Sequence, residues 1–184
     1  MQRKSFGHMP CPIARSLERV GEWWSMLIMR DALHGMRRFD EFQRSLGIAP
    51  NMLTRRLNAL VAAGLLERRR YSERPPRHEY VPTARGRELR PVLLALLAWG
   101  NRHFAPEGAS VELIDRATGA VAEPILVDRL SGRPITETDH VLAAGPAAPE
   151  RTRLRYASAA GAAGSASQEP YSRPNRAARK RSRT

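Results

Sequence analysis

The stretch PNMLTRRLNALVAAGLLERRRYSERPPRHEY, residues 50–80, changes its pattern at its midpoint. In the first half, leucines and a valine recur every three or four residues, as on one buried face of a helix. Pro50 suits the first turn of that helix, and Gly64 suits its end. The second half has no helical stripe and contains two prolines. It predicts two strands, about residues 65–71 and 78–82, joined by a polar turn.

Apolar residues at helical spacing predict three helices before this stretch, over about residues 13–20, 23–35 and 38–47. A long helix is expected after the strands, over residues 83–104, with Thr83 as its N-cap. Pro91 should kink this helix or mark the start of its regular turns. Apolar residues cover more than one of its faces, so we expect it to pack on its own core and on a second subunit. The residues expected at that dimer interface are Leu89, Leu93, Leu96 and Trp99.

This order of elements predicts a mainly α (α+β) fold, a winged helix-turn-helix with a two-stranded wing. At about 100° per residue, burying the leucines of the helix that starts at Pro50 turns its polar residues outward. Arginine pairs with guanine, asparagine with adenine, and threonine with phosphate or the thymine methyl group. Arg56 lies at the edge of the buried stripe and is expected to meet phosphate or an acidic neighbour. The residues expected to contact double-stranded DNA are Asn51, Thr54, Arg55, Arg56 and Asn58 of this helix, with Arg74 and Arg77 at the tip of the wing.

Taken alone, such a helix is more often an ordinary amphipathic helix with a solvated polar face. The order of elements favours the DNA interpretation, because a helix-turn-helix is followed by a strand, a basic turn with Arg74 and Arg77 at its tip, and a second strand. Charge alone does not decide between the two. The chain has a net charge of +13, with net values of +10 for residues 1–104, −4 for residues 105–142 and +7 for residues 143–184. Two basic blocks around an acidic one are typical of a polyanion partner, although a solvated arginine-rich surface would look the same.

These residues resemble the HxlR-type family of bacterial winged helix-turn-helix transcriptional regulators. The resemblance is carried by CPIARSLERVGEWW, by LIMRDALHGMRRFDEFQRSLGIAPNMLTRRLNALVAAGLLERRRY and by PPRHEYVPTARGRELRPVLLALLAWG, in order over about residues 11–100. It implies a homodimer that binds inverted repeats near promoters, with dimer contacts from the N-terminal segment and the long last helix. The chain departs from the family where Ala49 and Pro50 replace the usual Ser or Thr cap. It also departs where Trp23 replaces a basic residue.

Cys11 is the only cysteine of the chain and precedes a proline. The resemblance implies a candidate redox sensor here, because this Cys-Pro serves some family members as a thiol sensor. A thiolate at a helix N-terminus is stabilised by the helix dipole and by free N–H groups. The alternative is a small structural residue.

The sequence does not indicate an enzyme or a membrane protein. The five histidines are scattered, and no metalloprotease, nucleophile-elbow or phosphate-loop motif occurs, so we expect no catalytic residue, metal or cofactor. No apolar run of membrane-spanning length exists. A cytoplasmic, nucleoid-associated protein is expected.

Three regions are expected along the chain. Residues 1–104 form the DNA-binding and dimerisation domain. Residues 105–142 contain an internal echo, LIDRATGAV and LVDRLSGRPI, which predicts a small β-hairpin extension. Residues 143–184 have too few large apolar residues to offset the entropy lost on ordering, and they are expected to form a disordered Arg-rich tail.

The function expected from these features is sequence-specific regulation of transcription, as a repressor. Two alternatives stay open, a nonspecific nucleoid-associated DNA binder and a thiol- or ligand-responsive sensor that acts through Cys11 or residues 105–142. An unidentified small-molecule or electrophile effector would be the partner of such a sensor.

Overall fold

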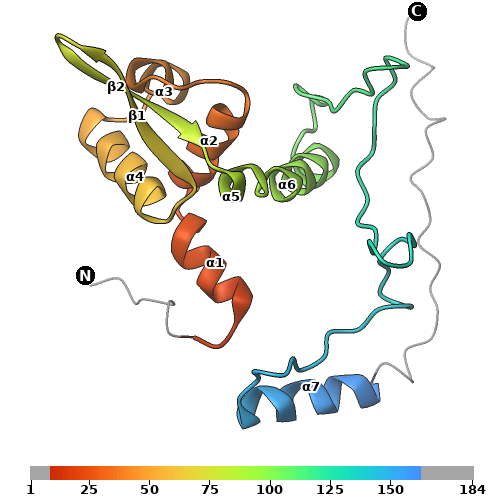
Figure 1. Ribbon diagram of the computed structural model, residues 1–184. Helices are drawn as coiled ribbons and strands as arrows, with labels where there is room; N and C mark the ends of the chain where they lie inside the picture. The colour runs from red at the N-terminus through yellow and green to blue at the C-terminus, as the bar shows by residue number, and fades with distance from the viewer. Residues whose placement is uncertain (1–8, 163–184) are drawn as a thin grey trace, which may run out of the picture. The chain divides into compact units, whose positions relative to one another are not determined.

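The computed structural model describes residues 9–162 (Figure 1). The chain divides into two units, one up to Pro134 and one from Ile135 onward. In chain order the elements are α1 (Pro12–Val20), α2 (Trp23–Leu33), α3 (Phe39–Leu46), α4 (Pro50–Ala62), β1 (Leu66–Glu73), β2 (Pro76–Pro82), α5 (Ala84–Arg87), α6 (Arg90–His103) and α7 (Glu150–Ala162). Helices α2 to α4, the β1–β2 hairpin and the helices after it form a winged helix-turn-helix, as the sequence predicts.

The boundaries of the central elements follow local backbone chemistry. Gly47 ends α3 with φ +59°, a left-handed conformation that glycine adopts without strain. Thr83 caps α5, because its hydroxyl accepts from the backbone N–H of Gly86 at 3.0 Å. The helix expected over residues 83–104 is two helices, and Pro91 stands in the first turn of the second, α6.

The wing is longer than the sequence pattern predicted. Strands β1 and β2 pair antiparallel from Leu66 opposite Pro82 to Glu73 opposite Pro76, with an irregularity at Tyr71. The loop before α3 joins the edge of this sheet, since the backbone N–H of Tyr80 donates to the carbonyl of Arg37 at 2.8 Å. This pairing holds the base of the wing against the helix-turn-helix.

The hydrophobic core lies between α2, α3, α4 and the base of the wing. Its fully buried side chains come from all of these elements and are Ile28, Met29, Phe42, Leu53, Leu57, Leu60 and Leu66. Two residues expected at a dimer interface, Leu89 and Leu93, pack against this core instead. The other two, Leu96 and Trp99, are 47% and 54% exposed.

The extension after α6 forms two similar turns. Each turn is closed by one isolated β-bridge, Ile114 with Val121 and Val127 with Pro134. In the first, the Asp115 carboxylate accepts from the backbone N–H groups of Ala117 and Thr118, and Asp128 plays the same part in the second. These contacts lower the pKa of Asp115, chiefly through the backbone N–H of Thr118. The internal echo is therefore a repeat of turn structure, although no full strands form in residues 105–142.

Part of the region expected to be disordered, residues 143–184, is helical. Residues Glu150–Ala162 form α7, because arginine and alanine are strong helix formers even where no apolar stripe exists. Residues 163–184 lie outside the described residues, as do the first eight.

Candidate nucleic-acid interface

Helix α4 presents a polar face to solvent. Its leucines at positions 53, 57 and 60 are fully buried, and this fixes the rotation of the helix. Asn51, Thr54, Arg55 and Asn58 are all exposed, as the helical wheel predicted. The Thr54 hydroxyl donates to the carbonyl of Pro50 at 2.9 Å, and the Asn51 side chain accepts from the N–H of Met52 at 2.7 Å. These local bonds fix both side chains close to the start of the helix.

Arg55 and Arg56 differ sharply in their surroundings. Arg55 is exposed, and its side chain forms no hydrogen bond or ion pair with the residues from 9 to 162. The guanidinium of Arg56 lies 3.0 Å from the carboxylate of Glu22, and its side chain is only 14% exposed. Arg56 therefore forms an ion pair with an acidic neighbour, which was the alternative to a phosphate contact that the sequence left open. It ties α4 to the residue that precedes α2.

The wing carries arginine along β1 and around its tip. Arg74 and Arg77 are exposed and form no ion pair within the described part of the chain. Arg69 pairs with Glu67, and Arg70 pairs with Glu73 at 3.1 Å. The tip arginines are therefore available to a ligand in a way that the strand arginines are not.

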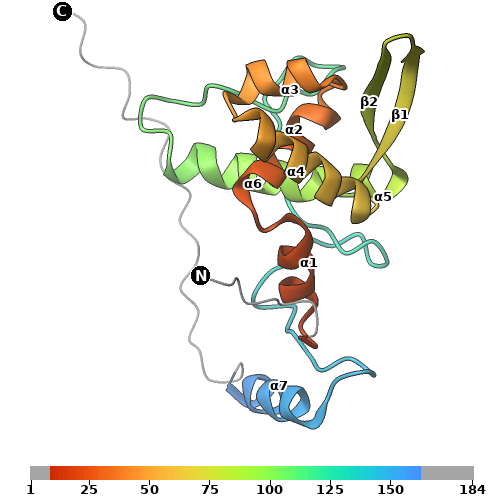
Figure 2. The ribbon, with the colours of Figure 1, turned by 90° about the vertical axis from the view of Figure 1, so that its left-hand side faces the viewer.

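Helix α4 and the wing share one face of the molecule. Figure 1 shows both on its left side, and Figure 2, which faces that side, shows α4 in front of α2 and α6 with the wing beside it. A helix and a basic hairpin on one face can contact adjacent parts of a DNA duplex, the helix in the major groove and the hairpin at the backbone or minor groove.

A buried carboxylate fastens the first helix of the pair, α3, to α2. Asp31 is 2% exposed, and it accepts from the Ser45 hydroxyl and from Arg30 Nε, each at 2.7 Å. Because Ser45 lies near the C-terminal end of α3, this bond sets how α3 lies on the core. Buried charge is tolerated here because it is paired and hydrogen-bonded.

The N-terminal end of α3 is held by a second carboxylate. Glu41 accepts from the backbone N–H groups of Arg38 and Arg37, both at 2.8 Å. These hydrogen bonds lower the pKa of Glu41 below its ordinary value, and the bond from the backbone N–H of Arg38 has the larger effect. The side chain closes the first turn of α3 in the manner of a capping box.

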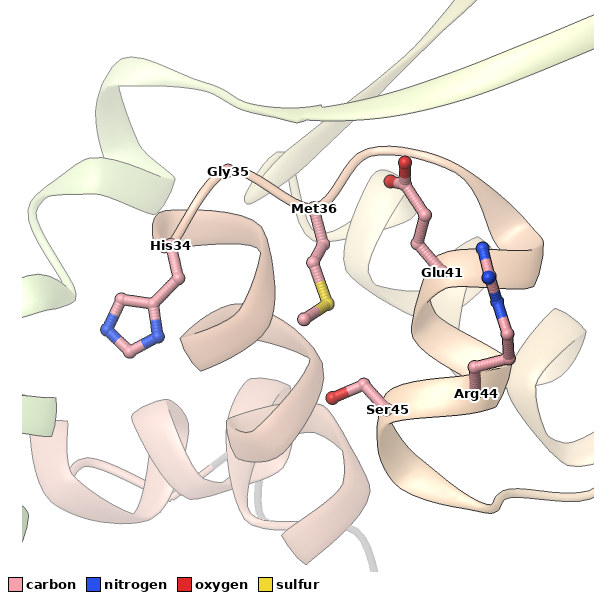
Figure 3. Close-up of a pocket in the computed structure, with 6 residues that line it drawn as sticks. All are labelled: His34, Gly35, Met36, Glu41, Arg44 and Ser45. Atoms are coloured by element: carbon pink, nitrogen blue, oxygen red, sulfur yellow. The ribbon is translucent and has the colours of Figure 1, made fainter. Parts of the chain in front are cut away.

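A shallow hollow beside these contacts has no catalytic arrangement. Figure 3 shows His34 pointing away from Glu41 and Arg44, while Ser45 faces Met36. The Ser45 hydroxyl donates to Asp31, and the Glu41 carboxylate accepts from backbone N–H groups. Neither group is therefore positioned to act as a nucleophile or as a base. Within residues 9–162 no cluster of three or more metal-ligating side chains occurs.

Comparison with known proteins identifies the fold and the class. Residues 19–108 match the HxlR-like helix-turn-helix family. An uncharacterized HTH-type transcriptional regulator of Mycobacterium tuberculosis is 40% identical over 135 residues, which are 73% of this chain and 85% of that protein. The chain belongs to the HxlR-like family. It is a transcriptional regulator with a helix-turn-helix DNA-binding domain.

Two solved structures resemble this HxlR-like chain. PA1374, a candidate transcription factor from Pseudomonas aeruginosa, is 62% identical, with a TM-score of 0.58, and the match covers 79% of this chain and 99% of that one. PA1607, another candidate transcription factor, is 37% identical with a TM-score of 0.68, over 76% of this chain and 99% of that one. No helix in the described part of the chain is long and apolar enough to cross a membrane.

Sequence reasoning missed several features of this HxlR-like domain. The loop residues Arg37 and Arg38 belong to the wing, where the guanidinium of Arg38 lies 4.9 Å from the centre of the Tyr71 ring. The ion pair of Arg56 with Glu22 joins residues far apart in sequence. A pattern along one element gives no signal for either contact, because both depend on how elements pack.

Proposed function

We propose that the chain is a homodimeric repressor that binds an inverted-repeat operator. The observation that carries the proposal is the shared face of α4 and the wing, with Arg55 and the tip arginines free of internal ion pairs in the described residues. In this proposal α4 enters the major groove and reads bases through Asn51, Arg55 and Asn58. Thr54 and the wing arginines contact phosphates.

The dimer would form on the apolar face that α6 leaves exposed. Val92, Leu96 and Trp99 form one stripe along the helix and are 49%, 47% and 54% exposed. Phe104 extends the stripe, with its ring centre 4.8 Å from that of Trp99. Apolar surface of this kind on a folded domain marks an interaction site.

Helix α1 would supply the second part of the interface. Its apolar side chains Ile13 and Leu17 are 68% and 48% exposed, and none of its residues is buried. Val20, at the end of α1, packs against the core, whereas Ile13 and Leu17 are left uncovered, and a partner surface would bury them. This proposal keeps the N-terminal segment that the family resemblance implies and, on the last helix, replaces Leu89 and Leu93 with Val92.

Repression is the sign of regulation that we propose, because blocking a promoter needs only a dimer that occupies its operator. The protein would act in the cytoplasm on nucleoid DNA. The test is selection of bound genomic fragments at near-physiological salt, followed by footprinting and by expression measurements in a deletion strain. A palindromic footprint whose adjacent gene is more strongly expressed in the deletion strain supports the proposal. Uniform protection without a preferred sequence would instead support a nonspecific nucleoid binder.

A thiol response is a second candidate function, favoured by the position of Cys11. This residue is the N-cap of α1, partly exposed, and no side-chain hydrogen bond occupies that cap. Oxidation there would disturb α1 and through it the proposed dimer. Cys11→Ser should bind the operator as the wild type does but lose release by peroxide or diamide. An unchanged release in the variant would return Cys11 to a structural role.

A further inference from the structure

A cavity of about 570 Å³ lies between α2, α6 and residues 110–113. Its walls are mainly apolar, with Met26, Leu27 and Leu33 from α2 and Leu93, Leu94 and Leu97 from α6. This volume falls within the range of roughly 300–1,000 Å³ that is typical of small-molecule sites.

The cavity exists because α2 is apolar on two sides. Ile28 and Met29 are fully buried in the core of the domain. Met26, Leu27 and Leu33, which line the cavity, are only partly buried. A helix with this much apolar surface is normally buried all round, so the second side needs an occupant.

The segment after α6 closes one side of the cavity. The chain leaves the C-terminal end of α6 and turns back toward α2 (Figure 2). The Asn101 side chain donates to the carbonyl of Val111 at 2.9 Å, and Arg102 pairs with Glu123 at 2.6 Å. The first bond holds residues 110–113 against α6 as a wall of the cavity, and the second ties the end of the first turn to the same helix. The cavity is therefore built by the extension as well as by the winged domain.

Charge at the rim favours an anion. Arg30 and Arg90 line the cavity against a single carboxylate, Glu112. Arg30 forms an ion pair with Asp31, whereas Arg90 forms no ion pair with any residue that the structure describes. An apolar chamber with an uncompensated arginine at its edge fits an organic acid with an apolar body.

The proposed dimer stripe and the cavity occupy different sides of α6. At about 100° per residue, Val92, Leu96 and Trp99 centre on one direction, and Arg90, Leu93, Leu94 and Leu97 centre roughly 140° away. Leu96 alone belongs to both sets. A second copy packed on the stripe would therefore leave the cavity to another occupant.

We propose that this cavity binds an amphipathic organic anion, with its apolar body between α2 and α6 and its acidic group at Arg90. The inference goes beyond the proposed function, because binding at this cavity requires neither an operator nor a repressor role. Its position against α2, which packs on α3 and α4, makes it a place where a ligand can affect the helix-turn-helix without occupying the proposed dimer stripe.

The test uses the full-length protein and two fluorescent probes that share their rings. Anilinonaphthalene sulfonate is anionic, and phenylnaphthylamine lacks the sulfonate. The wild type should bind one sulfonate probe per protomer and bind it more tightly than the neutral probe. Arg90→Gln should weaken the sulfonate probe by about two- to fivefold, the effect of one partly exposed ion pair, and leave the neutral probe unchanged. Arg116→Gln, an exposed arginine of the first turn, is the matched control and should change neither.

A second pair of variants separates the cavity from other apolar surface. Leu97→Trp should occupy part of the chamber and weaken binding of both probes while circular dichroism shows an intact fold. Trp99→Glu, which alters the exposed stripe, should leave both affinities unchanged. Equal affinity of the two probes, or no effect of Arg90→Gln, would overturn the anion site. Sedimentation that shows the sulfonate probe splitting dimers would overturn it too, since the cavity would then belong to a second copy of the chain.

Discussion

Arg55 and Arg56 show how neighbouring residues of one type can serve different ends. One step of about 100° around α4 carries the side chain from open solvent to the contact with Glu22. The first arginine is free to bind DNA, and the second holds two helices together. A list of basic residues would treat the two alike, whereas their burial separates them.

The first prediction compares these two residues. Arg55→Ala should leave the free energy of unfolding unchanged and weaken specific DNA binding by about 1–3 kcal/mol, because one bidentate base contact is lost. Arg56→Ala should lower the free energy of unfolding by about 1–3 kcal/mol, because the ion pair that ties α4 to Glu22 is lost. Denaturant titration and binding to selected genomic fragments measure the two effects. Intact affinity in a folded Arg55→Ala protein would remove that residue from the readout.

The second prediction concerns Glu41 and pH. Its folded-state pKa is lowered by the N–H groups of Arg38 and Arg37, so its stabilising effect is complete above the ordinary value of 4.5. That effect is lost as the pH falls through the lowered value. Glu41→Gln should cost about 1 kcal/mol at neutral pH, as for loss of a cap, and should flatten the acid side of the stability profile.

At the scale of elements, periodicity predicted the helices well because each buries one stripe against a common core. The outward face of α4 followed directly from its leucines. The wing strands were predicted too short, since the two strands stay paired as far as Glu73 opposite Pro76, beyond their apolar residues. The close packing of α5 against Leu65 was not predictable from periodicity, and it leaves no room for a side chain at Gly86. A Cβ atom at Gly86 would lie 2.1 Å from the Leu65 carbonyl oxygen.

The candidate site was predictable where it depends on one helix and unpredictable where elements meet. The exposed residues of α4 could be named from the helical wheel. The ion pair of Arg56 and the cavity beside Arg90 could not, because each requires the relative placement of segments that sequence spacing does not give. The same limit explains the dimer surface, where Leu89 and Leu93 turned out to face the core.

The third prediction tests α6 as a dimer element. Trp99→Glu should convert dimers to monomers, because the interface would bury an unpaired charge. Leu130→Glu is the control, since Leu130 is 90% exposed in the second turn of the extension and lies off α6. Sedimentation at micromolar concentration distinguishes the two variants. A wild type that sediments as a monomer would refute the premise, and loss of the dimer in Leu130→Glu alone would place the interface on the extension.

At the scale of the whole molecule, charge is arranged in three blocks. The basic winged domain is followed by an acidic extension and then by residues 143–184, which carry nine basic and two acidic residues. The described part of this last block includes α7, whose exposed arginines repeat at every second position from 151 to 155. Basic residues far from the reading helix add affinity for phosphate without reading bases.

The last prediction removes this block. A chain that ends at Leu142 should keep its operator preference, because α4 and the wing are untouched. Its affinity for all DNA should fall, and the log–log dependence of affinity on salt should become shallower. Each lost phosphate contact lowers that slope by ~0.9, and because only some of the nine basic residues engage at once, we expect a loss of roughly 2–5 units of slope.

A chain that ends at Ala162 is the matched control for this experiment, since it keeps α7 and removes the six basic residues beyond it. Its slope should lie between those of the full chain and the shorter one, because the residues kept with α7 hold part of the charge. An unchanged slope in both truncated chains would mean that this block does not touch DNA. Loss of operator preference in the chain ending at Leu142, with the winged domain still folded, would mean that the specific reader is not α4. One series of salt titrations thereby measures the contribution of phosphate contacts separately from the contribution of base contacts.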